Sequence, residues 1–237
     1  MSYRSKKKKS KFFEIFNPKR IVMDFARVTG WLPTQLVLRP RYHYHNTPKS
    51  RKIKGRVLLV CNHINWVDPA LISIAYIKRR VYTVTAEDVM GTGWGYRFFR
   101  GIGCIPINRE EPDLKSFGMI VDNLKKDRVV LIFPEGKIAH SDKEDLLPFK
   151  SGTTVLAIRT NAPIIPIYSA GNYKTFRRAD IMIGKPINLK DHYDGLLTME
   201  NIESLTNLIQ DRMNELKIVM TEIITNRSKK KRKDDDK

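Results

Sequence analysis

A histidine and an aspartate stand five positions apart in CNHINWVDPALI, residues 61 to 72, directly after an apolar run. A carboxylate that accepts a hydrogen bond from one imidazole nitrogen leaves the other nitrogen free to act as a base near neutral pH. On a regular helix, a spacing of five residues would separate the two side chains by about 140°. A turn between a strand and a helix removes that obstacle, so we expect His63 and Asp68 to meet on such a turn.

These residues also have other interpretations. Asp68 precedes Pro69 and an apolar segment, a pattern typical of an N-cap followed by the first helical position. His63 alone is consistent with a hydrogen-bonded polar group at a strand end. Cys61 and His63 would face the same side of a strand, as a thiol nucleophile and its base would require. The apolar residues 57–60 instead favour an inert, buried thiol at Cys61.

The turn depends on the strands and helices around it, which the apolar pattern predicts. Short apolar runs predict strands at Val57–Cys61, Val81–Thr85, Cys104–Ile107, Val129–Phe133, Ile164–Tyr168 and Ile181–Ile183. Helical spacing predicts helices at Pro69–Lys78, Pro112–Lys126, Gly152–Thr160 and along an apolar stripe from Ile202 to Ile223. This alternation predicts an α/β fold, a single domain whose mixed, largely parallel sheet is covered by helices, with functional loops at strand ends. We expect both cysteines, Cys61 and Cys104, to be reduced core thiols.

Basic residues concentrate near the N-terminus. Residues 1–56 carry sixteen Lys and Arg against two acidic residues, a balance of +14 within the chain's formal +19. Aromatic and aliphatic residues separate these charges, but no apolar run reaches the roughly 18 to 20 residues that a spanning helix needs, and no signal peptide is visible. The mixture predicts amphipathic helices on an anionic membrane surface, and a peripheral or monotopic protein at the cytoplasmic face of the cell membrane. An ordinary helix pair packed on the domain, with a solvated basic tail, is the alternative.

The composition also predicts domain boundaries. We expect a basic disordered tail at 1–10, an amphipathic helical membrane-association segment at 11–47, the α/β domain at 48–226 and a charged disordered tail at 227–237. The histidines show no ligand spacing, and GTGWG at 91–95 is a weak glycine pattern, so we expect no metal and no cofactor. A basic nucleic-acid-binding module would explain the tails alone. We expect no nucleic-acid partner, because such a module leaves the ordered motifs unexplained.

Those motifs carry a family resemblance. NHINWVDP, residues 62–69, resembles the NHxxxxDP signature of the glycerolipid acyltransferase family, whose familiar members are the 1-acylglycerol-3-phosphate acyltransferases. Three later blocks follow in the family's order: GCIPINR at 103–109, FPEG at 133–136 and APIIPI at 162–167. LPFKSG at 147–152 is also similar to family sequences. Together the blocks cover roughly residues 55 to 170.

The resemblance implies a reaction and roles for residues. It implies transfer of an acyl chain from acyl-CoA or acyl carrier protein to the free sn-2 hydroxyl of a lysophospholipid, 1-acylglycerol-3-phosphate, giving phosphatidic acid. It implies that His63 deprotonates the hydroxyl, that Asp68 orients and stabilises the imidazolium, and that no acyl-enzyme forms. Arg109 corresponds to a phosphate-binding arginine, and a planar guanidinium suits phosphate whatever the family. A solvated residue after a strand is the alternative for Arg109.

The third block supplies further candidates and a departure from the family. By the resemblance, Glu135 and Gly136 are substrate-binding residues, and a glycine permits close approach of the backbone. Family members commonly read FPEGTRS, whereas this chain reads FPEGKIAHS. Lys137 or Lys150 would then replace the second phosphate-binding arginine as a point charge, without its bidentate geometry. An acceptor with another lysolipid headgroup is the alternative that this departure leaves open.

Overall fold

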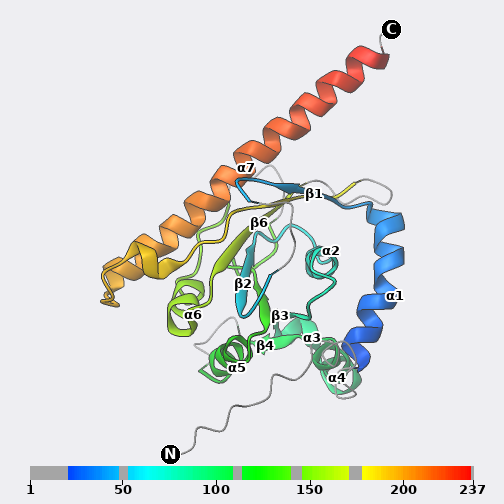
Figure 1. Ribbon diagram of the computed structural model, residues 1–237. Coiled ribbons are helices and arrows are strands. Elements are labelled where there is room, and N and C mark those ends of the chain that lie inside the picture. The colour runs from blue at the N-terminus through cyan, green and yellow to red at the C-terminus, as the bar shows by residue number, and fades with distance from the viewer. Residues whose placement is uncertain (1–20, 48–52, 109–113, 140–145, 171–177, 236–237) are drawn as a thin grey trace, which may run out of the picture.

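A seven-stranded sheet with the order β1-β7-β6-β2-β5-β3-β4 forms the centre of the protein (Figure 1). The computed structural model describes residues 21–47, 53–108, 114–139, 146–170 and 178–235. The strands are β1 (Arg41–Tyr44), β2 (Val57–Cys61), β3 (Val81–Ala86), β4 (Ile105–Ile107), β5 (Val129–Ile132), β6 (Ile164–Ala170) and β7 (Asp180–Ile183). The helices are α1 (Ile21–Leu38), α2 (Asp68–Ala75), α3 (Glu87–Met90), α4 (Gly93–Gly101), α5 (Leu114–Lys125), α6 (Gly152–Thr160) and α7 (Met199–Asp235), with a 3-10 turn η3 (Leu189–His192).

Most strand pairs are parallel, as predicted. β2 pairs in parallel with β5 and β6, and β3 pairs in parallel with β5 and β4. β1 is parallel to β7, and β6 and β7 form the one antiparallel pair among the described strands. The carboxyl ends of β2, β3, β4, β5 and β6 therefore lie along one edge of the sheet, where their loops can bring distant segments together.

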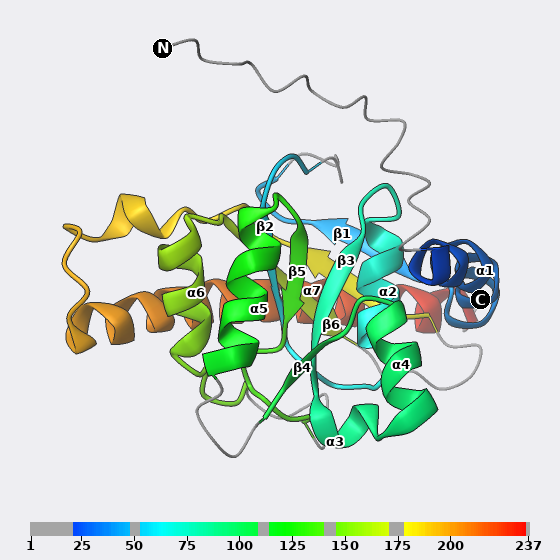
Figure 2. The same cartoon turned by 90° about the horizontal axis from the view of Figure 1, so that it is seen from below.

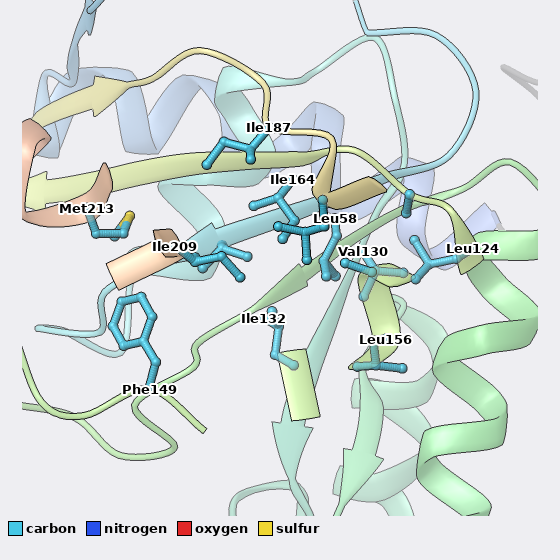
Figure 3. Close-up of a cluster of buried hydrophobic side chains, with 14 of the residues drawn as sticks. Leu58, Leu124, Val130, Ile132, Phe149, Leu156, Ile164, Ile187, Ile209 and Met213 are labelled. Carbon is cyan, nitrogen blue, oxygen red and sulfur yellow. The ribbon is translucent and has the colours of Figure 1, made fainter. Parts of the chain in front are cut away.

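The two faces of β2 are covered by different helices. Leu58 and Val60 pack in a cluster with α5, α6 and α7, whereas Leu59 and Cys61 pack in a cluster with α2. Burial on both faces explains why β2 is a continuous apolar run with no polar alternation. Figure 3 shows the first cluster, in which side chains of the sheet pack against side chains of the helices. The strand residues are Leu58, Val130, Ile132 and Ile164, and the helix residues are Leu124, Leu156, Ile209 and Met213.

β1 lies inside the segment predicted to be helical at 11–47. It pairs with β7 along its whole length, so the sheet begins before the predicted boundary at residue 48. Arg39 has a φ of 42° and precedes Pro40, which disfavours helix at the residue before it and ends α1. The helical prediction is therefore wrong for residues 41–44, because this short polar strand is defined by its partner and carries no apolar pattern.

α1 lies inside the same predicted segment, before β1. Its Met23 is buried, and its Asp24 accepts hydrogen bonds from Arg27 and Arg80. The predicted tail at 1–10 lies outside the described residues. Of the helices in the described ranges, none combines the length and apolar character needed to cross a bilayer.

α7 is the helix predicted from the apolar stripe, and it extends further than expected. Residues 227–237 were predicted to be a disordered tail, but the helix continues to Asp235, with its red end projecting beyond the domain in Figure 1. Arg227 anchors this part by donating hydrogen bonds of 2.9 and 3.2 Å to Asp180. Lys and Arg are good helix formers, so a charged composition does not by itself end a helix.

The contact between α7 and the sheet leaves no room for a larger residue at Gly184. A Cβ at Gly184 would lie 2.9 Å from Pro166 Cγ and 3.0 Å from Leu216 Cδ1. We predict that Gly184→Ala lowers the free energy of unfolding by about 1 to 3 kcal/mol, because the methyl group overpacks the contact. Urea denaturation measures this change.

Gly118→Ala is the matched control, because Gly118 lies within α5 and a Cβ there meets no atom within 4 Å. It should raise the free energy of unfolding by about 0.5 to 1 kcal/mol through helix propensity. Equal effects of the two substitutions would contradict the packing that the structure shows.

Candidate active site

The loop between β2 and α2 brings His63 and Asp68 into contact. His63 Nδ1 lies 3.0 Å from Asp68 Oδ2. The Asp68 side chain is fully buried, whereas the His63 side chain keeps 17% of its surface exposed. The predicted contact is therefore present, on a strand-to-helix turn and with the imidazole on the accessible side.

Asp68 shapes this loop and does not cap the helix. Its Oδ2 accepts hydrogen bonds from the backbone N–H groups of Ile64 and Asn65, at 2.9 and 2.8 Å. Helix α2 begins at Asp68 itself, its N-cap is Val67, and no side chain caps it. The N-cap interpretation is therefore wrong, because the carboxylate faces back toward the preceding loop and folds it.

A residue from β6, which the sequence did not indicate, also binds this carboxylate. Ser169 Oγ donates to Asp68 Oδ1 at 3.1 Å. Asn62 fixes Ser169, because its side-chain amide donates to the Ser169 carbonyl at 3.0 Å and accepts from the Ser169 N–H at 2.7 Å. Asn62 thereby extends the pairing of β2 with β6 by one side chain. The contact joins residues 101 positions apart, so spacing within a motif could not reveal it.

These hydrogen bonds assign the charge of Asp68 and the tautomer of His63. Two backbone N–H groups, a hydroxyl and the imidazole converge on the buried carboxyl group. An ionised carboxylate only accepts hydrogen bonds, so His63 Nδ1 carries the proton and Nε2 keeps its lone pair. Phe133 stacks on the ring with centroids 4.1 Å apart and 21° between the planes. The site therefore presents an oriented imidazole whose Nε2 is free to accept a proton.

The FPEG block borders His63. Glu135 Oε1 accepts a hydrogen bond from the His63 N–H at 3.4 Å. Burial raises the pKa of Glu135, and the N–H groups of Leu147 and His63 partly offset this effect. Gly136 has a φ of 71°, and a Cβ there would lie 3.0 Å from Lys150 Cε. Glycine therefore permits both the turn and the passage of the Lys150 side chain across it.

The structure describes two of the three predicted phosphate-binding residues, Lys137 and Lys150. Lys137 and Lys150 are both exposed. The Lys150 N–H donates to the Pro134 carbonyl at 3.0 Å, which ties LPFKSG to the FPEG turn. Arg109 lies outside the described residues, two positions after the end of β4 in the sequence.

Cys61 does not have the surroundings of a nucleophile. It is fully buried, and burial, with smaller contributions from Asp68 and Glu135, raises the pKa of its thiol well above the ordinary value. Its Sγ lies 3.7 Å from Asn62 Oδ1, to which it donates. Both cysteines are free and buried, as predicted, and a protonated, buried Cys61 is inert.

The raised pKa of Glu135 gives a prediction about stability. The folded chain binds this proton more tightly than the unfolded chain, so the wild type should lose stability as pH rises from 4.5 through the raised pKa. Glu135→Gln keeps the acceptor oxygen but cannot ionise. We predict that the free energy of unfolding of the wild type, minus that of Glu135→Gln, decreases over this range in urea denaturation.

The matched control is Glu203→Gln, which removes a carboxylate from an exposed position of α7. A wild-type minus Glu135→Gln difference that stays constant with pH, or that increases, would contradict the effect of burial on Glu135.

The chain is similar in sequence to known acyltransferases. A family model described as Acyltransferase matches residues 40–170, which is more than half of the chain. A 1-acyl-sn-glycerol-3-phosphate acyltransferase of Bacillus subtilis is 24% identical over 180 residues, covering 74% of this chain and 86% of that protein. One of Streptococcus pneumoniae is 27% identical over 183 residues, covering 73% of this chain and 65% of that protein.

A solved structure shows the same fold. The 1-acyl-sn-glycerophosphate acyltransferase PlsC of Thermotoga maritima matches with a TM-score of 0.61 and 18% identity, covering 87% of each chain. The match supports the α/β architecture described above. The family model confirms the resemblance that the sequence blocks carried, and the chain belongs to the Acyltransferase family.

Proposed function

We propose that this protein transfers a fatty acyl chain to the free sn-2 hydroxyl of 1-acylglycerol-3-phosphate, giving phosphatidic acid in phospholipid biosynthesis. The observation that carries the proposal is the contact of His63 Nδ1 with the buried Asp68 carboxylate, which leaves Nε2 as a base in a chain of the Acyltransferase family. The named activity of the two bacterial relatives supports this acceptor. An acceptor with another lysolipid headgroup is the second candidate, because Lys137 and Ile138 replace the family's Thr-Arg.

The mechanism follows from the assigned tautomer. His63 Nε2 takes the proton of the acceptor hydroxyl, whose oxygen attacks the thioester carbonyl of acyl-CoA or acyl carrier protein. The tetrahedral intermediate collapses, the C–S bond breaks, and the leaving thiolate takes the proton back from the imidazolium. Asp68 stabilises the imidazolium between these steps. Ester and free thiol are the products, and the enzyme carries no acyl group.

We propose that Arg109 binds the acceptor phosphate through paired hydrogen bonds. Lys150, which crosses the turn at Gly136, and Lys137 on the same loop would add positive charge to this binding. Glu135 accepts a hydrogen bond from the His63 N–H and so positions the histidine at the acceptor site.

We further propose that α1 holds the enzyme on the anionic cytoplasmic face of the cell membrane. Five of its exposed apolar residues follow helical spacing and form one stripe: Ile21, Phe25, Val28, Leu32 and Leu36. Val22, Trp31 and Val37 are exposed on either side of it. Its other side packs on the domain through Met23 and Asp24. A stripe of this kind, next to a basic N-terminal sequence, suits a helix that lies in the interface.

A headgroup panel tests the proposed acceptor. Purified protein is given labelled acyl-CoA or acyl carrier protein and lysolipids that differ only in headgroup: phosphate, phosphoglycerol, phosphocholine and phosphoethanolamine. We expect the highest kcat/KM with the phosphate headgroup. A higher value with another headgroup would overturn the acceptor, and no transfer to any of them would overturn the reaction.

Substitutions at the pair test the roles of its members. His63→Ala should lower kcat/KM by about a hundred- to ten-thousandfold, the usual contribution of a positioned base. Asp68→Asn should lower it by a large part of that factor while the fold survives. The asparagine oxygen can still accept from Ile64 and Asn65, and its amide can donate to Ser169 Oγ, but no charge stabilises the imidazolium. Steady-state kinetics and thermal unfolding measure the two properties.

Cys61→Ala is the control for this pair and should keep most activity. Full activity of Asp68→Asn, combined with an inactive Cys61→Ala and acyl chains trapped on sulfur in the wild type, would replace the His63–Asp68 mechanism with a thiol mechanism.

Arg109→Ala should lower kcat/KM for the phosphorylated acceptor by about ten- to a hundredfold, since a charge-assisted hydrogen bond contributes about 1.5 to 3 kcal/mol. Arg109→Lys should restore only part of this. Lys126→Ala removes an exposed charge between α5 and β5, at the opposite edge of the sheet, and should change nothing. Unaltered acceptor kinetics in a folded Arg109→Ala would place the phosphate elsewhere, with Lys137→Ala and Lys150→Ala as the next variants.

A further inference from the structure

Exposed apolar side chains gather at the edge of the sheet that carries the site. Outside α1, five of them follow the carboxyl ends of β2, β3 and β5, and together we name them the rim: Trp66, Val89, Trp94, Phe98 and Ile138. Trp66 is 81% exposed and Trp94 is 84% exposed. Side chains of this size are seldom grouped on a surface that meets only water.

The sheet topology places the rim around His63. β2 and β3 are both parallel to β5, which lies between them, so with strands about 4.8 Å apart α3 begins about 10 Å from the end of β2. Trp66 lies in the loop from His63 to Asp68 itself. Ile138 precedes Ala139, whose N–H donates to the His63 carbonyl at 2.7 Å. The rim therefore borders the base from three loops.

α4 contributes no buried side chain to the core of the domain. None of its residues is buried, and Trp94 and Phe98, four residues apart, lie on the same side of the helix. The exposed Arg97 stands between them in the sequence, and Arg100 donates to the Cys104 carbonyl at 3.0 Å. Aromatic and arginine side chains on one short helix are typical of the interface between lipid headgroups and acyl chains.

α4, which carries the rim residues Trp94 and Phe98, contacts α1 beside the apolar stripe. A Cβ at Gly101, the last residue of α4, would lie 3.2 Å from Val22 Cγ1, so the two helices are in contact. Figure 1 shows α4 beside the first turns of α1, and Figure 2 shows α3 and α4 together along one edge of the sheet. A single flat partner could contact the rim and α1 together if it binds both apolar side chains and cations. A bilayer with anionic headgroups is such a partner.

We infer that the rim inserts into the bilayer surface, so that the mouth of the site is itself a membrane contact. This inference rests on the proposed action on lysolipids and adds a contact separate from that of α1. When the rim is inserted, the acceptor hydroxyl can reach His63 Nε2 while the acyl chain of the acceptor stays in the lipid. The base then works at the level of the headgroups.

Single-tryptophan variants test the rim, because the chain has three tryptophans. One variant keeps Trp94 (Trp31→Phe, Trp66→Phe), and another keeps Trp31 on α1 (Trp66→Phe, Trp94→Phe). Each is mixed with phosphatidylglycerol and phosphatidylcholine vesicles whose acyl chains are brominated. We expect the emission of Trp94 to shift to shorter wavelength and to be quenched by the bromine atoms, as for Trp31.

A second measurement compares vesicle binding of two double variants. Trp94→Ser with Phe98→Ser should weaken binding by at least about tenfold, because two large apolar side chains are removed from the contact. The matched control is Leu196→Ser with Leu197→Ser, an exposed apolar pair between η3 and α7, and it should bind as the wild type does.

The outcomes separate the rim from α1 and from catalysis. A response of Trp31 without one of Trp94 would leave the α1 contact standing and overturn the rim, and no response from either would overturn both. A Trp94 shift that depends on protein concentration without vesicles would assign the rim to a second copy of this chain and overturn the lipid contact. None of these signals depends on turnover, so a failed headgroup panel is distinguishable from a failed rim.

Discussion

The buried charge of Asp68 is the constraint on which the site depends. An ionised carboxylate without solvent contact is unfavourable by several kcal/mol unless hydrogen bonds compensate it. Here the compensation comes from the loop after β2, from Ser169 on β6 and from the imidazole. One charge therefore connects the path of a loop, strand β6 and the orientation of the imidazole. Oδ1 depends on the Ser169 hydroxyl, whereas Oδ2 shares three donors, so loss of Ser169 would leave a buried oxygen without this hydrogen bond.

The parallel sheet holds this buried group close to an exposed apolar edge. Its strands are buried on both faces, so β2, β5 and β6 hold their carboxyl ends rigidly, and Asn62 adds a side-chain link between β2 and β6. The polar network of Asp68, Ser169 and Asn62 is buried on the interior side of His63. The exposed apolar residues of the rim lie on the solvent side. The imidazole thus lies between a buried polar network that compensates the charge of Asp68 and an outer edge that carries exposed apolar side chains.

The sequence predicted the elements and contacts that local patterns determine. It did not predict those that depend on partners far away in the chain. The sheet and the helix that covers it could be predicted from the apolar runs of β2 and β5 and from the stripe of α7. The His63–Asp68 contact could be predicted from the turn that precedes Pro69. Ser169 and β1 were not predictable in this way, because each is defined by a segment more than 100 positions away. α4 escaped prediction because it has no buried side from which a pattern could arise. The charged end of α7 resembled a disordered tail in composition, although its residues favour helix.

The tautomer of His63 decides whether the residue can act as a base, because base catalysis requires a free lone pair on Nε2. Nitrogen-15 NMR of histidine-labelled protein, with His63 assigned from the signals missing in His63→Ala, reports the protonation of both ring nitrogens in the neutral imidazole. We predict a proton on Nδ1, directed at Asp68, and an unprotonated Nε2. A neutral ring with its proton on Nε2 would show that Asp68 does not receive this hydrogen bond, and it would contradict base catalysis by His63.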